Sequence, residues 1–466
     1  MNSMRRALLL ASITSAAFPA IAQAVAADSW AMADAIRARV RAPIFPARRF
    51  PITDYGAVGD GAKDCTDAFR QAIAACNAAG GGRVVAPRGE WATGAIHLKS
   101  NVELHLEDGA AIRFSRDPAA YLPLVYTRWE GVECMNYSPF IYAFEQDNIA
   151  ITGSGVIDGR SSAEYWWPWK GRADIGWREG MPKQDSARTR LFQMGDDNVP
   201  VAQRRFGEGS YLRPQFIQPY RCRNVLIEGV TLMGSPMWQV HPVLCQNVTV
   251  RGLTIDGGGG PNTDGCDPES CTDVLIENCI FNTGDDCIAI KAGRNGDGRR
   301  TATPSQNIVI RNCQMRDGHG ALTVGSEISG GVRYVFAENC QMSSPHLDHA
   351  IRIKNNAMRG GDLEHLYFRD LRIGQVSHAV VTVDFNYEEG ASGAFTPILR
   401  DLVAERIASG SSPHAVDLQG LPNAPATDIL IKDCDFSGVT GENIIRNVQN
   451  LRFDHVRVNG RMIAPN

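Results

Sequence analysis

The chain repeats one short pattern of polar and apolar residues over most of its length. The pattern is a polar residue, three positions rich in Val, Ile and Leu, two mostly polar positions and one apolar position. Copies begin at Asn224, Asn247, Asp273, Asn307, Tyr334, His365, Asp401, Asp428 and Asn450. Alternating apolar residues at intervals of 22 to 36 residues, with Gly and Asn between them, predict a solenoid of stacked strands. We therefore expect an all-β fold, a parallel β-helix, rather than a helical repeat.

The last position of the pattern alternates between aliphatic residues and cysteines. The cysteines at this position are Cys279, Cys313, Cys340 and Cys434. Because Val, Leu or Ile takes their place in the other copies, we expect these four to be buried side chains and not disulfides. Cys266 with Cys271, or Cys65 with Cys76, are better candidates for a disulfide.

Two segments lie outside the repeat. An amphipathic helix is predicted over residues 67–76, where it would cap the N-terminal end of the solenoid. Between about 160 and 222 the repeat is lost, and this insertion holds four of the eight tryptophans. Their rings either stack on sugar faces or pack the insertion onto the solenoid. Residues 27–466 are predicted to form a single domain with this one insertion.

The first 26 residues have the features of an export signal. Arg5 and Arg6 precede an apolar run, and small residues end the segment. The arginine pair is also compatible with the twin-arginine route. The mature protein is therefore expected to be periplasmic or secreted, without a membrane segment. A formal charge of -4 argues against a general nucleic-acid-binding surface.

Acidic residues and a histidine recur in three consecutive coils. Asp285 lies twelve residues after the start of its copy of the pattern, and His319 lies twelve residues after the start of the next. Equal offsets in adjacent coils place the two side chains one above the other. Asp286 is adjacent, and Asp264 can reach the same face from the coil before. Crowded carboxylates repel one another, so at least one should keep its proton, as the acid-catalysed cleavage of a glycosidic bond requires.

A pair of basic residues follows on the next coil. Arg352 and Lys354 are two positions apart, so on a strand they point to the same side. Fixed positive charge beside an acidic site suits a substrate that carries its own carboxylates. The expected partner at this point is a sugar chain that carries carboxylates, an acidic polysaccharide.

At these residues the chain resembles glycoside hydrolase family 28, the polygalacturonase family. The motifs Asn-Thr-Asp, Gly-Asp-Asp, Gly-His-Gly and Arg-Ile-Lys stand in that order at 262–264, 284–286, 318–320 and 352–354. The resemblance covers about residues 50–460 and implies a right-handed parallel β-helix, hydrolysis with inversion, and no metal or other cofactor.

The resemblance also implies a role for each residue. Asp285 would be the general acid, Asp264 and Asp286 would position the attacking water, and His319 would support the acid. Arg352 and Lys354 would bind the galacturonate carboxylate, with Tyr387 as a further substrate contact. Stacked coils can bring the carboxyl groups closer than the roughly 6.5–9.5 Å typical of inverting enzymes, so the stereochemistry rests on the resemblance alone.

Other substrates and activities stay open. The arginine and lysine favour polygalacturonate, and rhamnogalacturonan or a substituted pectin is the alternative. The insertion, together with the likeness of residues 325–331 to bacterial exo-acting members, favours cleavage from a chain end. A calcium-dependent eliminase would use Asp264, Asp267, Asp285 and Asp286 as ligands. A non-catalytic β-helix adhesin would tolerate Asp285→Asn without loss of function.

Overall fold

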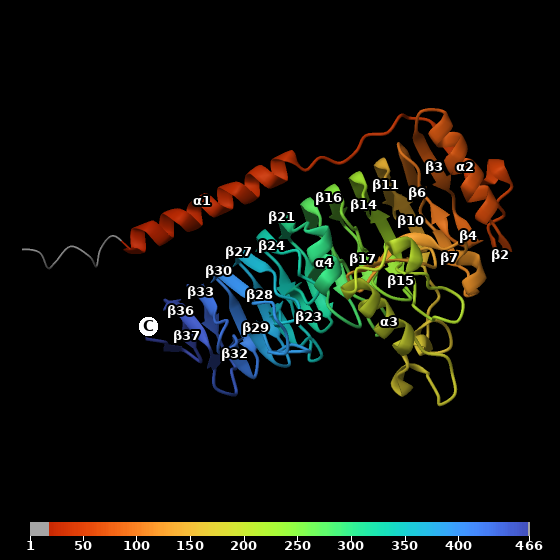
Figure 1. Cartoon of the computed structure of the whole chain (residues 1–466). Coiled ribbons are helices and arrows are strands. Elements are labelled where there is room, and N and C mark those ends of the chain that lie inside the picture. Colours follow the sequence, from red (N-terminus) through yellow and green to blue (C-terminus); the bar gives the residue numbers. More distant parts are fainter. Residues whose placement is uncertain (1–17, 465–466) are drawn as a thin grey trace, which may run out of the picture.

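The computed structural model describes residues 18–464 and has the predicted fold, a right-handed parallel β-helix. Figure 1 shows the strands stacked coil upon coil from the α2 end of the chain to its C-terminus. Most of the export segment predicted over residues 1–26 lies outside the described residues. Within the described part of the chain, no helix is both long and apolar enough to cross a membrane.

Sheet A has thirteen parallel strands and forms one wall of the solenoid. Its strands, in spatial order, are β1 (Arg49–Pro51), β3 (Gly82–Ala86), β6 (Val102–Leu106), β11 (Asp147–Gly153), β14 (Arg223–Glu228), β16 (Gln246–Arg251), β18 (Thr272–Glu277), β21 (Ser305–Arg311), β24 (Val332–Glu338), β27 (Asp362–Arg369), β30 (Ile398–Glu405), β33 (Ala426–Lys432) and β36 (Val448–Asp454). All nine copies of the sequence pattern coincide with strands of this sheet, from β14 onward.

Sheet B has fourteen strands, all parallel except the last pair. They are β2 (Asp60–Asp64), β4 (Gly89–Thr93), β7 (Ala110–Phe114), β12 (Val156–Asp158), β15 (Thr231–Met233), β17 (Thr254–Asp256), β19 (Ile280–Asn282), β22 (Gln314–Asp317), β25 (Gln341–Met342), β28 (Arg372–Gln375), β31 (Ala408–Ser411), β34 (Asp435–Phe436), β37 (Arg457–Val458) and β38 (Arg461–Met462).

Sheet C and the loops beside it hold the residues singled out in the sequence. Its strands are β5 (Ile96–His97), β10 (Ile141–Phe144), β13 (Ile217–Tyr220), β20 (Ile288–Ile290), β23 (Gly320–Val324), β26 (His349–Lys354), β29 (Ala379–Asp384), β32 (His414–Gln419) and β35 (Ile444–Arg446). Single bridges through Val240 and Cys266 connect β13 to β20. A separate antiparallel hairpin consists of β8 (Val125–Trp129) and β9 (Val132–Asn136).

The polar residue that starts each copy of the pattern marks a bend into sheet A. All nine of these residues have a φ between 53° and 60°, in the left-handed region. Asn and Asp tolerate this conformation better than other non-glycine residues, which explains their recurrence. The side chains of Asn148, Asn224 and Asn247 also donate to one another from coil to coil, at 2.7 and 2.8 Å. The polar residue of each copy therefore specifies where the chain bends into sheet A.

The interior is a continuous apolar core in which equivalent positions stack in register. Val225, Val248, Val274 and Ile308 lie one above the next on successive strands of sheet A, and all are buried. The four cysteines predicted to be core residues are buried, as expected. The disulfide candidates were wrong, because all twelve cysteines are free and buried. They occupy core positions like the aliphatic residues around them.

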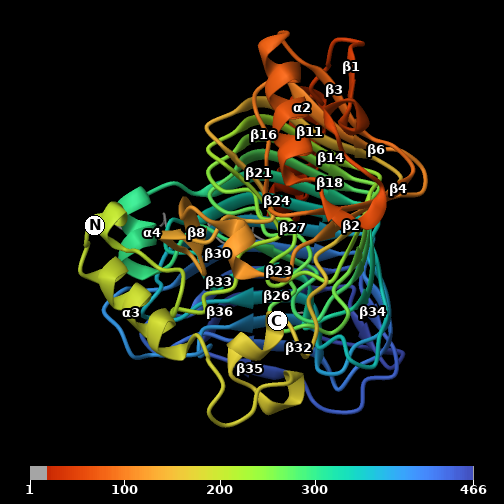
Figure 2. The ribbon, with the colours of Figure 1, turned by 90° about the vertical axis from the view of Figure 1, so that its right-hand side faces the viewer.

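The helices cover the N-terminal end and the outside of the solenoid. They are α1 (Phe18–Arg39), η1 (Ile52–Tyr55), α2 (Thr66–Ala78), η2 (Pro118–Tyr121), η3 (Trp167–Lys170), η4 (Ala173–Ile175), α3 (Asp185–Asp196), η5 (Val201–Gln203) and α4 (Asn295–Thr301). Helix α2 is the predicted cap and packs on η1 and the first strands (Figure 2). Helices α3 and α4 and the β8–β9 hairpin gather on one side of the coil, at left in Figure 2.

Helix α1 was not anticipated from the sequence. Its C-terminal half lies along the outer face of sheet A (Figure 1), where Trp30 packs edge-on against Phe336 at 5.5 Å. Arg369 lies 3.6 Å over the Trp30 ring, and Arg39 forms an ion pair with Asp273 at 2.7 Å. The helix thereby covers an outward-facing apolar stripe of sheet A that would otherwise be exposed.

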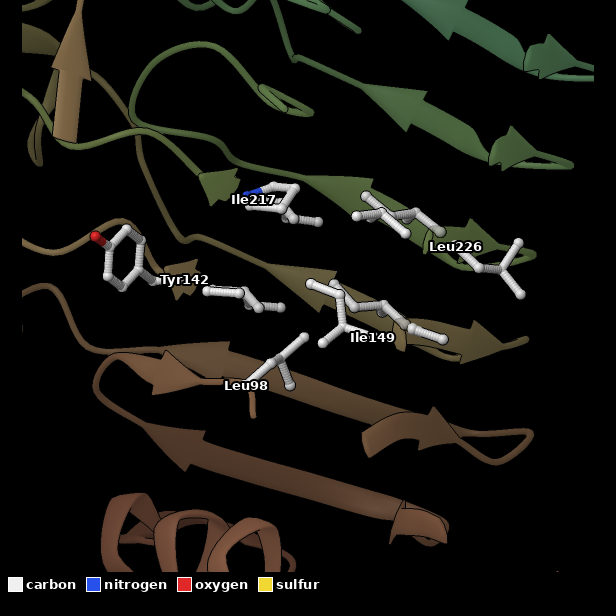
Figure 3. A pocket seen from close by; sticks show the side chains of 12 residues that line it. Leu98, Tyr142, Ile149, Ile217 and Leu226 are labelled. Carbon is white, nitrogen blue, oxygen red and sulfur yellow. The ribbon is translucent and has the colours of Figure 1, made fainter. Parts of the chain in front are cut away.

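A small apolar gap remains where strands β10, β11, β13 and β14 meet. Figure 3 shows its lining of mostly aliphatic side chains, among them Leu98, Ile149, Ile217 and Leu226. The cavity volume of about 10 Å³ leaves room for one water at most. It is a packing defect of the core and not a ligand site.

Candidate active site

The loops that lead into sheet C bring the residues predicted from the sequence together. Asp285 and Asp286 precede β20, and His319 precedes β23 on the next coil. The backbone N–H of His319 donates to the carbonyl of Asp285 at 3.0 Å. Gly265, next to Asp264, donates to the carbonyl of Asp286 at 3.0 Å. Three successive coils therefore present their polar residues on one face, as the equal offsets predicted.

Asp285 and His319 form a hydrogen-bonded pair. The Nδ1 atom of His319 lies 3.0 Å from Oδ1 of Asp285. Burial alone raises the pKa of Asp285, but the hydrogen bond and charge of His319, with the charge of Lys354, leave that pKa below its usual value. The hydrogen bond to Asp285 raises the pKa of His319 despite burial. When this pair holds one proton, the two shifts place it on the imidazole and not on the carboxylate.

Asp286 is held by two cations. Nζ of Lys354 donates to its Oδ2 at 2.7 Å, and Nη1 of Arg352 donates to its Oδ1 at 3.4 Å. Burial raises the pKa of Asp286, but these charges outweigh it and hold the pKa well below its usual range. Arg352 and Lys354 do lie on the same side of β26, as the spacing predicted.

A glycine between these groups makes the contact possible. Gly320 lies on the coil between Asp286 and Arg352, and a Cβ there would lie 2.8 Å from Oδ1 of Asp286 and 3.2 Å from Cδ of Arg352. The missing side chain lets the guanidinium reach across one coil to the carboxylate. The Gly-His-Gly motif therefore has a steric reason as well as a chemical one.

Of the three carboxyl groups Asp264, Asp285 and Asp286, Asp264 is the one whose pKa is raised. It is buried, and burial together with the neighbouring charges of Asp267 and Asp285 raises its pKa well above the usual value. The sequence predicted that one of the crowded acids would behave in this way. It did not predict which, and the pKa of Asp285, the acid implied by the resemblance, is shifted in the opposite direction.

The three carboxylates are close enough to be considered as a metal site. Asp264, Asp285 and Asp286 each offer an oxygen within 4.8 Å of the others. However, Lys354 and Arg352 already contact both oxygens of Asp286, and the Nδ1 atom of His319 contacts Asp285. Protein cations therefore already compensate the charge of Asp286, which does not favour a calcium ion there or the eliminase alternative. The separation is also shorter than the roughly 6.5–9.5 Å typical of inverting enzymes, as the stacking led us to expect.

Tyr387 lies beside the cationic pair. Its ring centre is 5.1 Å from Nζ of Lys354 and 5.6 Å from the guanidinium carbon of Arg352. The residue follows β29, one coil beyond Lys354. The structure thus brings all seven residues proposed from the sequence to one region of sheet C.

A hollow of about 270 Å³ opens beside the Asp285–His319 pair. The coils contribute Gly284, Gly318 and His319 to its wall, and the insertion contributes Arg172 and Ile175. The insertion therefore closes one side of the space next to the acidic residues.

The tryptophans of the insertion mostly pack against protein. Trp166 is buried against Tyr121 and Phe140, with ring centres 5.4 and 5.6 Å away. Trp169 packs against Tyr211 at 5.2 Å. Trp167 donates its ring N–H to the carbonyl of Ser235 at 2.9 Å. These three rings therefore contact the protein, which is the packing role considered for them and not sugar stacking.

Sequence reasoning missed a buried cation behind the carboxylates. Nζ of Lys291 lies 3.9 Å from Oδ2 of Asp264 and 3.1 Å from Oε2 of Glu327. Lys291 follows β20, in register with Gly325 and Lys354 on the next two coils. A lysine directly after the apolar run 287–290 was the available sequence signal for a buried cation. It was not used, because a charged residue at a strand end is ordinarily solvated.

Comparison with known proteins gives consistent matches over most of the chain. The family model described as "Glycosyl hydrolases family 28" matches residues 204–456. A "Probable polygalacturonase" of Vitis vinifera is 30% identical over 404 residues, covering 82% of this chain and 73% of the relative. An "Exo-poly-alpha-D-galacturonosidase" of Dickeya chrysanthemi is 27% identical over 440 residues, covering 87% of this chain and 71% of the relative.

Among solved structures, the exopolygalacturonase of Thermotoga maritima, described as hyperthermoactive, is 43% identical to this chain. The two superpose with a TM-score of 0.91, covering 94% of this chain and 98% of the other.

Proposed function

The chain belongs to family 28 of the glycosyl hydrolases, and from this premise we propose that it hydrolyses the α-1,4-galacturonosidic bonds of polygalacturonate from a chain end. One observation carries the proposal. Three carboxyl groups with oxygens within 4.8 Å of one another lie directly beside Arg352 and Lys354. Acids next to fixed cations suit acid–base cleavage of a sugar chain that itself bears carboxylates.

In this proposal the Asp285–His319 pair supplies the proton for the leaving group. Below the raised pKa of His319 the pair holds one proton. When the sugar displaces water, a neutral pair is favoured over separated charges, so the proton moves to Asp285. Asp285 then donates it to the glycosidic oxygen as the bond from that oxygen to the anomeric carbon breaks.

Asp264 and Asp286 act on the attacking water. A carboxylate with a strongly depressed pKa is a weak proton acceptor, so Asp286 orients the water through its hydrogen-bonding capacity. Asp264, with its raised pKa, is the stronger base once it is ionised. It takes one proton from the water as the oxygen bonds to the anomeric carbon, and it returns that proton to solvent after product release. Inversion at the anomeric carbon is the course that the family resemblance implies.

Substrate recognition follows from the charges. Arg352 and Lys354 would bind a galacturonate carboxylate, and the Tyr387 ring beside them would contact the sugar. Arg352 can exchange Asp286 for the carboxylate of the sugar, because its contact with Asp286 is long, at 3.4 Å. The partner is thus an acidic polysaccharide or oligogalacturonide.

Cleavage from a chain end is supported by the wall beside the site. Arg172 and Ile175 of the insertion narrow the space next to His319. The relatives named as exo-acting point the same way. A cleft closed at one end accepts a chain terminus and not the middle of a polymer.

We further propose that residues 1–26 direct export, that residues 27–466 form one catalytic domain, and that the enzyme works in the periplasm or outside the cell. Polymeric pectin does not enter a cell, so an enzyme that hydrolyses it must be exported. Rhamnogalacturonan or a substituted pectin stays the alternative substrate.

Product analysis tests the proposal. Polygalacturonate digested by the enzyme should release reducing ends and a single small product from the earliest time points, without new ultraviolet absorbance. An early ladder of oligomers would refute the exo mode. Unsaturated, ultraviolet-absorbing products would refute hydrolysis, and activity confined to rhamnogalacturonan would favour the alternative substrate.

A further inference from the structure

Lys291 is a buried cation behind the carboxylates for which the proposed mechanism has no role. Its side chain is 3% exposed. The ammonium donates to Oε2 of Glu327 at 3.1 Å and to the carbonyl of Gly325 at 3.4 Å, and it lies 4.3 Å above the Trp238 ring. These contacts hold the ammonium, whose Nζ also lies 3.9 Å from Oδ2 of Asp264. Despite its burial, the charges of Asp267 and Asp264 both raise the pKa of Lys291.

Its surroundings are strongly acidic. The charged groups that act on Asp264 are Asp267 on the same loop, Asp285 and Asp286 before β20, Lys291 after it, and the buried Arg213. Their own charged partners are Glu327 beside Lys291, Arg294 beside Glu327, Arg352 and Lys354 beside Asp286, and His319 beside Asp285. Most of these cations have another carboxylate or carbonyl partner close by. Lys354 and Arg352 contact Asp286, Arg294 contacts Glu327, and Arg213 donates to Asn262 and two carbonyls.

Asp264 and Asp267 lack the hydrogen bonds that would otherwise stabilise their charge. Among the described residues, Oδ1 of Asp264 and both carboxylate oxygens of Asp267 are buried without a hydrogen-bond partner. A buried carboxylate without hydrogen bonds is ionised only if a nearby cation compensates it. Of the four side chains with the largest electrostatic effect on Asp264, three are acids and Lys291 is the only cation.

We propose that Lys291 is a positioning residue that compensates the negative charge of Asp264 and so sets the lowest pH at which the site can activate water. The inference rests on the proposed function, in which Asp264 accepts a proton from the attacking water. Lys291 is buried beneath the carboxylates and does not contact the sugar, so it acts on turnover and not on substrate binding. Glu327 opposes it by drawing the ammonium away from Asp264 and by adding negative charge.

Two variants that break the same ion pair should have opposite effects. Lys291→Met removes the cation, so Asp264 ionises at higher pH, and the acid limb of the kcat profile should rise by about one pH unit or more. Glu327→Gln removes the opposing charge, so the acid limb should fall. Arg294 still pairs with Glu327 in the methionine variant, at 3.3 Å, which limits the damage to folding. The rescue variant Lys291→Arg retains the charge and should keep the acid limb near that of the wild type.

The experiment measures kcat and KM on polygalacturonate from pH 3.5 to 8 for the wild type and the three variants, together with their thermal midpoints. Opposite shifts of the acid limb at a KM within about two-fold of the wild type support the inference. If Lys291 had only a structural role, both variants would lose activity equally at every pH, and the inference would be overturned. A wild-type enzyme that releases no reducing ends would refute the proposed function itself, which keeps the two failures distinct.

Discussion

Lys354→Met is the most informative single perturbation of the site. In the wild type Nζ of Lys354 donates to Oδ2 of Asp286 at 2.7 Å, and the two side chains are 6% and 1% exposed. Each partner favours the charged form of the other, since the pKa of Asp286 is lowered and that of Lys354 is raised. Methionine fills a similar volume without the charge. It leaves Asp286 with Arg352, 3.4 Å away.

The loss of unfolding free energy in this variant, and its pH dependence, follow from the burial of the ion pair. Breaking a buried ion pair by removing one partner costs about 3–5 kcal/mol of unfolding free energy. In the wild type the lowered pKa of Asp286 gives stability that is present above its unfolded pKa and is lost only at very low pH. In the variant that pKa rises above the unfolded value, so stability falls as pH increases between the two values. The loss at pH 7.5 should exceed the loss at pH 4.5 by about 1–3 kcal/mol.

Urea unfolding followed by tryptophan fluorescence measures this, because the chain contains eight tryptophans. The double variant Asp286→Asn/Lys354→Met is the control. It removes both charges, so its stability should be closer to that of the wild type at pH 7.5, and its loss relative to the wild type should be the same at pH 4.5 and pH 7.5. An equal loss for the single variant at both pH values, or a loss below about 1 kcal/mol, would refute the reasoning.

Four further predictions concern other parts of the molecule. Asp285→Asn should lower kcat by about 10²–10⁴-fold with little change in KM, as measured by reducing-end release. The same variant should lower the pKa of His319 in an NMR titration, because the hydrogen bond to Asp285 is the largest cause of its raised value; an unchanged titration would contradict the pairing. Trp30→Ala should cost up to about 3–5 kcal/mol by emptying the contact with Phe336 and should lower the thermal midpoint, while activity is unchanged since α1 covers sheet A and not sheet C. All twelve cysteines should react with a thiol reagent after unfolding and none before it; fewer than twelve would show a disulfide.

Sequence periodicity predicted the fold because a β-helix is built from local rules. Each copy of the pattern contains the inward-facing residues of one strand and an Asn, Asp or Gly at a bend with positive φ. The helix at 66–78 was also predictable, from its amphipathic pattern. Helix α1 was missed because its role depends on an apolar stripe that exists only once Leu275, Val309 and Phe336 are stacked side by side. The disulfide candidates failed for a related reason, since spacing along the chain does not show that a cysteine lies in the core.

The sequence by itself determined which residues meet at the site. Equal offsets from the start of each coil are enough to stack Asp285 under His319, and the spacing of two on one strand puts Arg352 and Lys354 on the same side. Only the tertiary structure decided how the protons are distributed among them. Whether a carboxyl group is ionised depends on burial and on every charge within a few ångströms, and those charges come from coils far apart in the chain. For this reason the pKa of Asp264 is raised while those of Asp285 and Asp286 are lowered, and Lys291 lies beside the carboxyl groups.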